Sequence, residues 1–600
     1  MKRLLFFFLS TTLLGYSSWH LYAEDSIPET NKQTHKILSP VSSSDTSSKW
    51  AEYIGPLQKW ESLTTSFSIQ SDLLFSLEQD QTNKSWLGNS YIQGTLRNNF
   101  IELGARFEDL SHPLPGRSTI EAGRGIPFLY LSAFYNKFAS ITIGDFYERF
   151  GGGTVLRAYE DRALGIDNAI RGVKATIKPW KGITIKGLWG QQRYTYDRTF
   201  KLFNKNRGYI SGADLDLDIT QWSKTMQNKM MNLSIGASFV NKSEPDEDIF
   251  VIRNEKNYRL NLPHNVQAVA GRLNFGYKGF IFNTEYAYKP NDPTAENNYI
   301  YHPGSVALFS LSYSKKGMSA LLQAKRSENF NFISKRSLLG MHLHINHMPP
   351  FSAQHTYALA TLYPYATQPA GEWAFQGEFN YKFARNTFLG GKYGSFIKIN
   401  FSHIRGLKKQ YLEGVDPTNP SSLFGTDGYT SSFFGMGDLY FSDIDVMFST
   451  KVNKVFNFSL SYLHQIYNQE VVEGHLVNEN QATPHIWSNI FIYDGSYKLS
   501  KKTSLRTELQ FLFTRHAEGH WVYGLAELSI SPNWMLSISD QYNMGVTKKH
   551  YFMGAIAYAH GSHRIQLSAG STRAGMNCSG GVCRWMPQTK GIYLSYNGNF

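Results

Sequence analysis

The feature of this sequence that most constrains its fold is a two-residue alternation of apolar and polar side chains, repeated along most of the chain. Residues 503–513 show it clearly, because Leu509 and Phe511 are separated by Gln510. In residues 213–219 three aspartates alternate with apolar residues. A strand places all three on one face, whereas a helix would spread them around its circumference. The pattern predicts an all-β protein whose strands each carry one polar and one apolar face.

Composition favours a membrane location for these strands. Phe, Tyr and Trp make up 15% of the chain, yet the mean hydropathy is −0.35. After residue 23 there is no run of about 18 apolar residues that could form a transmembrane helix. Barrel strands escape a hydropathy scan because only alternate residues face lipid. We therefore expect a large single-chain transmembrane antiparallel β-barrel; an exported protein made of several β-sandwich domains is the alternative.

The number and spacing of the alternating segments define the barrel further. They give about 24 strands, within a range of about 20 to 26. Short turns alternate with longer connections, which is the asymmetry between periplasmic turns and extracellular loops in outer-membrane barrels. An even strand number places both ends of the barrel on the short-turn side. The longer connections lie near residues 110–125, 149–167, 243–263, 291–302, 328–370, 407–430 and 470–483.

The N-terminal residues predict export. Lys2 and Arg3 precede an apolar run, and small and polar residues follow as far as Ala23. This is the pattern of a secretory signal peptide over residues 1–23, cleaved after Ala23, although Leu21 is an imperfect residue at its position before the cleavage site. Residues 24–61 are polar and predict a periplasmic leader, and residues 62–600 the barrel. The leader is too short for the globular plug of a TonB-dependent transporter.

The last ten residues, 591–600, form an alternating segment that ends on an aromatic side chain. With Tyr596 and Phe600 on its apolar face, it resembles the C-terminal recognition strand of bacterial outer-membrane β-barrels. That resemblance implies that the barrel-assembly machinery reads these two residues and that the last strand closes against the first, near residues 67–77. The expected location is the outer membrane of a Gram-negative cell, in contact with lipid and lipopolysaccharide.

The polar faces of the strands must line the lumen, because polar side chains cannot be buried in hydrocarbon. A barrel of this size encloses a wide interior that is either filled or conducts water. The net charge of +13 is scattered in predicted turns without a nucleic-acid motif, so no nucleic-acid partner is expected. The expected wall charges have both signs and include Asp214, Asp216, Asp218, Glu378, Lys382, Arg506 and Glu508.

Residues 149–172 form the densest polar segment. Its glycine triplet could cradle a phosphate, but it lacks the Lys-Ser/Thr of a P-loop. We expect instead a loop that folds inward and narrows the lumen, with its charges paired there; a solvated structural loop is the alternative. The candidate constriction residues are Gly151, Gly152, Gly153, Arg157, Glu160, Asp161, Arg162, Asp167, Asn168 and Arg171.

The same segment resembles a known family. Residues 148–160 and 165–173 are similar to the N-terminal region of an uncharacterised family of Bacteroidota outer-membrane β-barrel proteins. The resemblance is specific over about 30 residues. It implies the cell envelope of a Bacteroidota-type bacterium and supplies no activity.

The remaining motifs predict no chemistry. Cys578 and Cys583 are expected to form a small loop disulfide in an exported chain. The pairs His344 with His347 and His516 with His520 each lack a third metal ligand, and no Ser or Asp stands in a recognisable catalytic context. We therefore expect no cofactor, no metal and no enzyme activity. The leading hypothesis is a porin-like channel or translocation protein; the alternative is a non-conducting accessory subunit of an envelope secretion or assembly complex.

Overall fold

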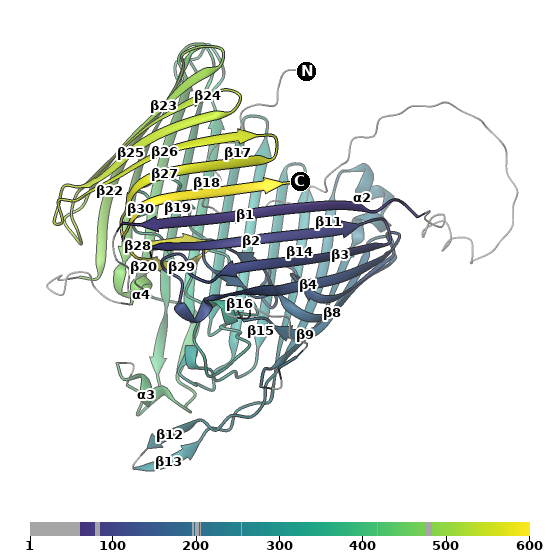
Figure 1. Cartoon of the computed structure of the whole chain (residues 1–600). Helices are drawn as coiled ribbons and strands as arrows, with labels where there is room; N and C mark the ends of the chain where they lie inside the picture. Colours follow the sequence, from purple (N-terminus) through teal and green to yellow (C-terminus); the bar gives the residue numbers. More distant parts are fainter. Residues whose placement is uncertain are drawn as a thin grey trace, which may run out of the picture.

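The computed structural model describes residues 60–77, 85–194, 197, 203–204, 206–253, 255–416, 418–474 and 483–600. The strands of this part form one 24-stranded antiparallel sheet that closes into a barrel (Figure 1). The all-β fold and the strand number expected from the sequence are therefore confirmed. The expected signal peptide and nearly all of the leader lie outside the described residues. Within the described part, no helix is long and apolar enough to cross a membrane.

The barrel strands follow one another around the sheet in chain order. They are β1 (Thr64–Ser76), β2 (Trp86–Arg97), β3 (Ile101–Leu110), β4 (Gly123–Tyr135), β5 (Ala139–Phe146), β8 (Ile170–Trp180), β9 (Ile183–Gln192), β10 (Tyr209–Asp218), β11 (Asn232–Ser243), β14 (Asn265–Tyr277), β15 (Phe280–Lys289), β16 (Gly304–Lys315), β17 (Met318–Glu328), β18 (Gly371–Lys382), β19 (Ser395–Tyr411), β20 (Tyr429–Lys451), β21 (Phe456–Asn468), β22 (His485–Lys498), β23 (Thr503–Phe513), β24 (Trp521–Ile530), β25 (Trp534–Asn543), β26 (His550–His560), β27 (His563–Thr572) and β30 (Thr589–Asn599).

Short helices and hairpins lie in the connections between the barrel strands. They are the hairpins β6 (Glu160–Asp161) with β7 (Ile166–Asp167), β12 (Phe250–Arg253) with β13 (Lys256–Arg259), and β28 (Gly575–Ser579) with β29 (Val582–Met586), the helices α2 (Lys224–Asn228), α3 (Pro420–Leu423) and α4 (Gln469–Glu473), and the 3-10 turns η1 (Thr119–Glu121), η2 (Ile219–Trp222), η3 (Ala295–Asn297) and η4 (Met341–Leu343).

The first and last strands close the barrel. β1 pairs with β30 from Ser68 opposite Asn599 to Ser76 opposite Gly591. The Phe600 amide then donates to the Phe67 carbonyl at 2.8 Å. Closure leaves no unpaired strand edge, which a sheet surrounded by lipid requires because hydrocarbon offers no hydrogen-bond partners.

The register separates a lipid face from a lumen face. On β23 the side chains of Leu509 and Phe511 are 48% and 40% exposed on the outside, whereas Gln510 between them is fully buried. Residues opposite each other in the register share a face, so the alternation carries around the whole barrel. The apolar band therefore faces lipid, and the polar set lines the interior.

The connections differ in length on the two sides of the barrel. Most turns on the side of the chain entry are short, but residues 219–231, which contain η2 and α2, and residues 383–394 are longer than expected. On the other side, the connection between β17 and β18 covers residues 329–370. The hairpin of β12 and β13 also starts on that side and projects away from the barrel (Figure 1).

Candidate functional site: a lumen filled by two loops

Two connections from the long-loop side fold into the lumen. We call residues 147–169, between β5 and β8, the glycine loop, and residues 329–370, between β17 and β18, the long loop. The glycine loop reaches Glu285 on β15, and the long loop reaches Gln510 on β23. Glu285 lies in the middle of β15, and Gln510 lies three residues from the end of β23 on the long-loop side, so the two loops fill the lumen from that side down to mid-depth.

The glycine triplet sits on a wall carboxylate. The Gly152 amide donates to Glu285 at 2.7 Å, and the Thr154 hydroxyl donates to the same carboxylate. Gly151 and Gly153 adopt φ of +50° and +94°, and a Cβ on Gly151 would lie 3.0 Å from the Glu285 carboxylate. The left-handed backbone and the close approach explain the need for glycine. Glu285 already occupies the anion position, so phosphate binding is not supported.

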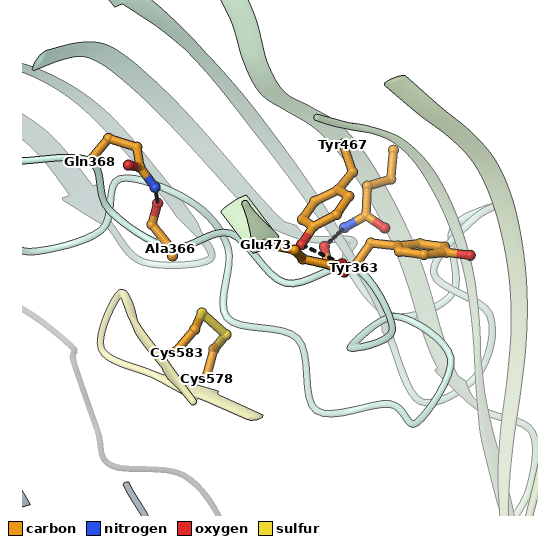
Figure 2. The surroundings of a disulfide bond; sticks show 8 residues. Tyr363, Ala366, Gln368, Tyr467, Glu473, Cys578 and Cys583 are labelled. Atoms are coloured by element: carbon orange, nitrogen blue, oxygen red, sulfur yellow. Dashed lines mark hydrogen bonds between the residues drawn. A yellow bond between two sulfur atoms is a disulfide. The ribbon is translucent and has the colours of Figure 1, made fainter. Parts of the chain in front are cut away.

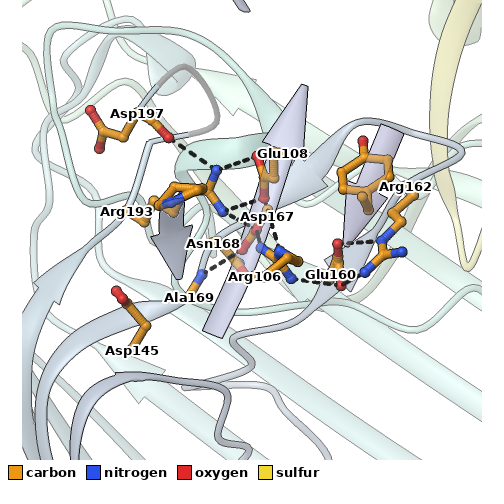
Figure 3. A network of polar contacts seen from close by, with 12 residues as sticks. Arg106, Glu108, Asp145, Glu160, Arg162, Asp167, Asn168, Ala169, Arg193 and Asp197 are labelled. Atoms are coloured by element: carbon orange, nitrogen blue, oxygen red, sulfur yellow. Dashed lines mark hydrogen bonds and ion pairs between the residues drawn. The ribbon is translucent and has the colours of Figure 1, made fainter. Parts of the chain in front are cut away.

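The charges of the glycine loop pair with wall arginines. Asp167 accepts from Arg106 on β3 and from Arg193 beyond β9, and Arg193 also binds Glu108 at 2.9 Å (Figure 3). Glu160 pairs with Arg106 at 3.0 Å. Burial alone would raise the pKa of Asp167, but the guanidinium groups of Arg193 and Arg106 hold it below the ordinary value. The network compensates buried charge, which is costly when unpaired.

Four further expected loop residues make contacts with the wall, with the long loop or within the glycine loop. Arg162 donates to Gln70 on β1 at 2.9 Å, and Arg157 lies over the Tyr159 ring at 4.6 Å. Asp161 accepts from the Leu164 amide at 3.0 Å within the loop. Asn168 donates to the His344 carbonyl of the long loop at 2.9 Å.

Arg171 is placed differently from the prediction. It lies in β8 and pairs with Asp145 on β5 at 2.8 Å, so it belongs to the barrel wall and not to the loop. No turn residue separates Asn168 from the following strand, which explains the misplaced boundary.

The long loop crosses half of the barrel interior, a position that sequence reasoning missed. Its Ala353 amide donates to Ser402 on β19 at 3.2 Å. Its Tyr363 carbonyl accepts from Gln465 on β21 at 3.0 Å. The loop is therefore held by side chains from several strands. Two more contacts of this kind join His355 to Asp443 on β20 at 2.9 Å, and the Leu359 amide to Gln510 on β23 at 2.8 Å.

The two loops are joined to each other, and we call them together the lumen filler. The Arg157 amide donates to the Ile345 carbonyl at 2.8 Å, and the His347 amide donates to the Gly153 carbonyl at 3.0 Å. Apolar side chains of both loops and of the wall form one buried cluster, which is typical of a packed core and not of a mobile flap. Its members include Phe150, Val155, Leu156, Phe330, Phe332, Phe351, Leu359, Ile490 and Leu512.

A buried ion pair anchors the long loop to the wall. Lys325 on β17 and Glu372 on β18 lie 2.6 Å apart with fully buried side chains. Lys325 also donates to the Pro349 carbonyl at 2.6 Å. Glu372 accepts from the Gln368 amide at 2.8 Å and from the Tyr365 hydroxyl. One ion pair thus holds two separate parts of the long loop.

The ring of His347 is buried where the loops meet. Its edge meets the Tyr159 ring at a centroid distance of 5.6 Å. Burial, together with the nearby cations of Arg157 and Lys325, holds the pKa of His347 well below the ordinary value. The docked loops therefore contain the neutral imidazole.

The disulfide hairpin lies over the outer end of the filler. Cys578 and Cys583 are joined by a disulfide between β28 and β29 (Figure 2). The Thr367 amide of the long loop donates to the Gly581 carbonyl at 2.9 Å. Arg584 donates to the Leu164 carbonyl of the glycine loop at 3.2 Å. The hairpin therefore touches both lumen loops.

The expected wall charges are distributed along the lumen. Arg272 on β14 binds Asp214 at 2.9 Å and Asp216 at 2.6 Å. Asp218 instead accepts from the Thr220 amide at 3.2 Å, at the short-turn end. Further around the wall, Glu378 pairs with Lys398 at 2.9 Å, and Arg506 pairs with Asp494 at 2.9 Å and with Glu508.

Lys382 lies at the short-turn end beside a cavity of about 430 Å³. The cavity lining includes three more lysines, Lys451, Lys454 and Lys498, and no carboxylate. The short-turn end of the lumen therefore carries a basic pocket between β18 and β22.

A closed 24-stranded sheet with an apolar outer band and a polar interior is a large β-barrel of the outer-membrane type. Residues 37–600 match the model of a family of unknown function, DUF6029. The chain belongs to that family. No curated protein matches the sequence.

Several solved structures are similar to the chain. The siderophore receptor PirA from Pseudomonas aeruginosa is 8% identical with a TM-score of 0.39, over 89% of this chain and 80% of that chain. The P pilus usher PapC translocation pore is 8% identical with a TM-score of 0.35, over 90% and 99%. OccAB3 from Acinetobacter baumannii is 8% identical with a TM-score of 0.32, over 90% and 99%.

Proposed function

We propose that this protein is a porin-like channel of the outer membrane, whose wide lumen is narrowed by the glycine loop and the long loop. The observation that carries the proposal is the position of these loops at mid-depth of a polar lumen, fixed by Glu285, by the Lys325–Glu372 pair and by a shared apolar cluster. A constriction of this kind limits the size of a solute, and charged side chains around it set its preference.

In this proposal the filler is permanent and not a gate. Nine or more apolar side chains of the loops and wall would lose their burial if the loops left the lumen. Each fully buried large side chain contributes about 1.5–3 kcal/mol, so undocking the loops is strongly unfavourable. Conduction would take place past the docked loops, by diffusion of small hydrophilic solutes and without catalysis.

The proposal includes the route to the membrane. Residues 1–23 would act as a cleaved signal peptide and residues 24–61 as a periplasmic leader before the barrel of residues 62–600. Tyr596 and Phe600 would be read by the barrel-assembly machinery. The mature barrel would lie in the outer membrane of a Bacteroidota-type bacterium, in contact with lipid and lipopolysaccharide.

One observation favours the alternative function, a non-conducting accessory subunit of an envelope complex. The hairpin of β12 and β13 projects from the barrel and exposes Phe250, Ile252 and Tyr258 at 56%, 73% and 50% (Figure 1). Exposed apolar side chains on a projecting element are a common form of protein contact surface. Under this alternative, the filled lumen would serve to keep the barrel closed.

Planar-bilayer recording of three forms of the barrel separates the two functions. In the first variant a short Gly-Ser linker replaces residues 329–370, which is feasible because Glu328 and Gly371 are paired in the register. The matched control removes residues 249–260, outside the lumen. We expect steady current from the wild type, larger current without the long loop, and unchanged current without the hairpin. If the wild type shows no current but binds a protein partner that the variant without residues 249–260 does not bind, the accessory role is supported instead.

A further inference from the structure

The two lumen loops cover the barrel wall unevenly. From β10 to β23, many lumen-facing side chains in the middle of the strands are buried beneath the loops. Examples from this covered wall are Asp214, Glu285, Gln323, Ser402, Gln465 and Gln510.

A second part of the wall, formed by β24 to β27 and β30 together with Asp72 of β1, is different. On β27, Gln566 and Ser568 face the lumen, because Ile565 and Leu567, which alternate with them, are exposed to lipid. Both lumen-facing residues are only partly buried, although they lie in mid-strand. Their neighbours on the same face are also partly exposed, and include Glu527, Ser539, Ser595 and Asp72. We call this part of the barrel the open wall.

Several charges of the covered wall are joined in close ion pairs. On the covered wall, Asp214 is paired with Arg272, and Lys325 with Glu372. On the open wall, Asp72, Glu527 and Arg564 make no ion pair with any residue that the structure describes.

Asp72 and Arg564 have neutral hydrogen-bond partners, whereas Glu527 lies opposite Arg506 in the register. Ser595 donates to Asp72 at 2.6 Å, and Arg564 donates to Gln566 at 2.7 Å. A charge without an ionic partner needs water, because burying it unpaired is expensive. The open wall is therefore the hydrated side of the lumen.

We infer that solutes cross the barrel along the open wall, between it and the docked loops, and not through the centre. This inference rests on the proposed channel function and names its path. The lining consists of amides and hydroxyls with two carboxylates and one guanidinium, Asp72, Glu527 and Arg564. Such a lining takes small hydrophilic solutes.

The test compares two single substitutions of serine by cysteine, Ser568→Cys on the open wall and Ser402→Cys on the covered wall. The change is nearly isosteric at both sites. Among the described residues the native cysteines are joined in a disulfide and leave no free thiol. Each purified full-length variant is reconstituted in a planar bilayer and treated with a cationic methanethiosulfonate reagent, with the wild type as control.

We expect the reagent to lower the current of Ser568→Cys below that of the untreated variant, with no change in Ser402→Cys or in the wild type. If the wild type conducts but Ser568→Cys keeps its full current, and mass spectrometry shows its thiol unmodified, the path along the open wall is wrong while the proposed channel function is not affected. Block of Ser402→Cys to the same extent would overturn it as well. A silent wild type would overturn the proposed function itself.

Discussion

The buried pair of Lys325 and Glu372 offers a direct perturbation of the lumen filler. Glu372→Gln keeps the shape of the side chain and removes its charge. Lys325 would then remain fully buried without a counter-ion, while still bound to the Pro349 carbonyl. Burying the unpaired ammonium, or removing its proton, costs free energy only while the long loop is docked, because an opened loop would let water reach Lys325. We therefore expect the substitution to favour opening of the long loop.

The size of the effect follows from the burial of the pair. Removing one partner of a buried ion pair costs about 3–5 kcal/mol. At about 1.36 kcal/mol per factor of ten, the population of the opened loop should rise by about two to four orders of magnitude. Amide hydrogen exchange of the folded barrel measures this. Exchange of Leu359 and Thr367 should accelerate, since their amides are bonded only in the docked loop, whereas amides of β23 should not change.

Glu378→Gln is the matched control, because Glu378 lies on the same strand and pairs with Lys398 while partly exposed. Loss of a pair of that kind costs less than about 1 kcal/mol. Adding Lys325→Met to Glu372→Gln removes the stranded charge and should recover part of the protection. If Glu372→Gln and Glu378→Gln exchange at the same rate, the pair does not anchor the loop and our reasoning is wrong.

Three other outcomes follow from the same structure. Leu509→Arg puts a charge on the lipid face at a cost of about 2–4 kcal/mol and should reduce the folded, heat-modifiable band on a gel. Ser504→Arg on the lumen face should leave that band unchanged. Equal loss of the band in both variants would contradict the register. Because the pKa of His347 is lowered in the docked loops, acidification through about pH 6.5 should destabilise docking. Amide hydrogen exchange of the long loop should then rise in the wild type and rise less in His347→Phe. Equal rises in the two proteins would show that His347 does not cause the pH dependence. Reducing the Cys578–Cys583 bond should leave the barrel's melting temperature unchanged, since the hairpin lies outside the barrel sheet and closes a short loop; a lower melting temperature would give the hairpin a role in barrel stability.

Sequence reasoning recovered the barrel because its main signal is local. Alternation within each strand fixes which residues face lipid, and it identified Leu509 and Phe511 correctly. The inward course of the glycine loop also left a local signal, since a glycine triplet beside charged residues suits a tight, buried turn. The end of that loop could not be located, because Arg171 follows Asn168 without a turn residue between the two.

The inward course of the long loop was not predicted, although the loop carried a signal. Residues 329–370 contain Phe330, Phe332, Phe351 and Leu359 without any periodicity, and a solvated loop would not hold so many large apolar side chains. The partners of these residues could not be predicted, because they come from strands far apart in the sequence. The same holds for Glu285, which lies 133 residues from Gly152. The residue that holds the glycine loop is brought to it only when the barrel closes.

The most direct test of the narrowed channel is single-channel conductance of the wild-type barrel in the presence of poly(ethylene glycol)s of increasing size. Small polymers that enter the pore lower its conductance, and polymers too large to enter do not. We predict measurable conductance with a polymer cut-off far below that of the variant in which a short linker replaces residues 329–370. A silent wild type, or a wild type with the same wide cut-off as that variant, would contradict the narrowed channel.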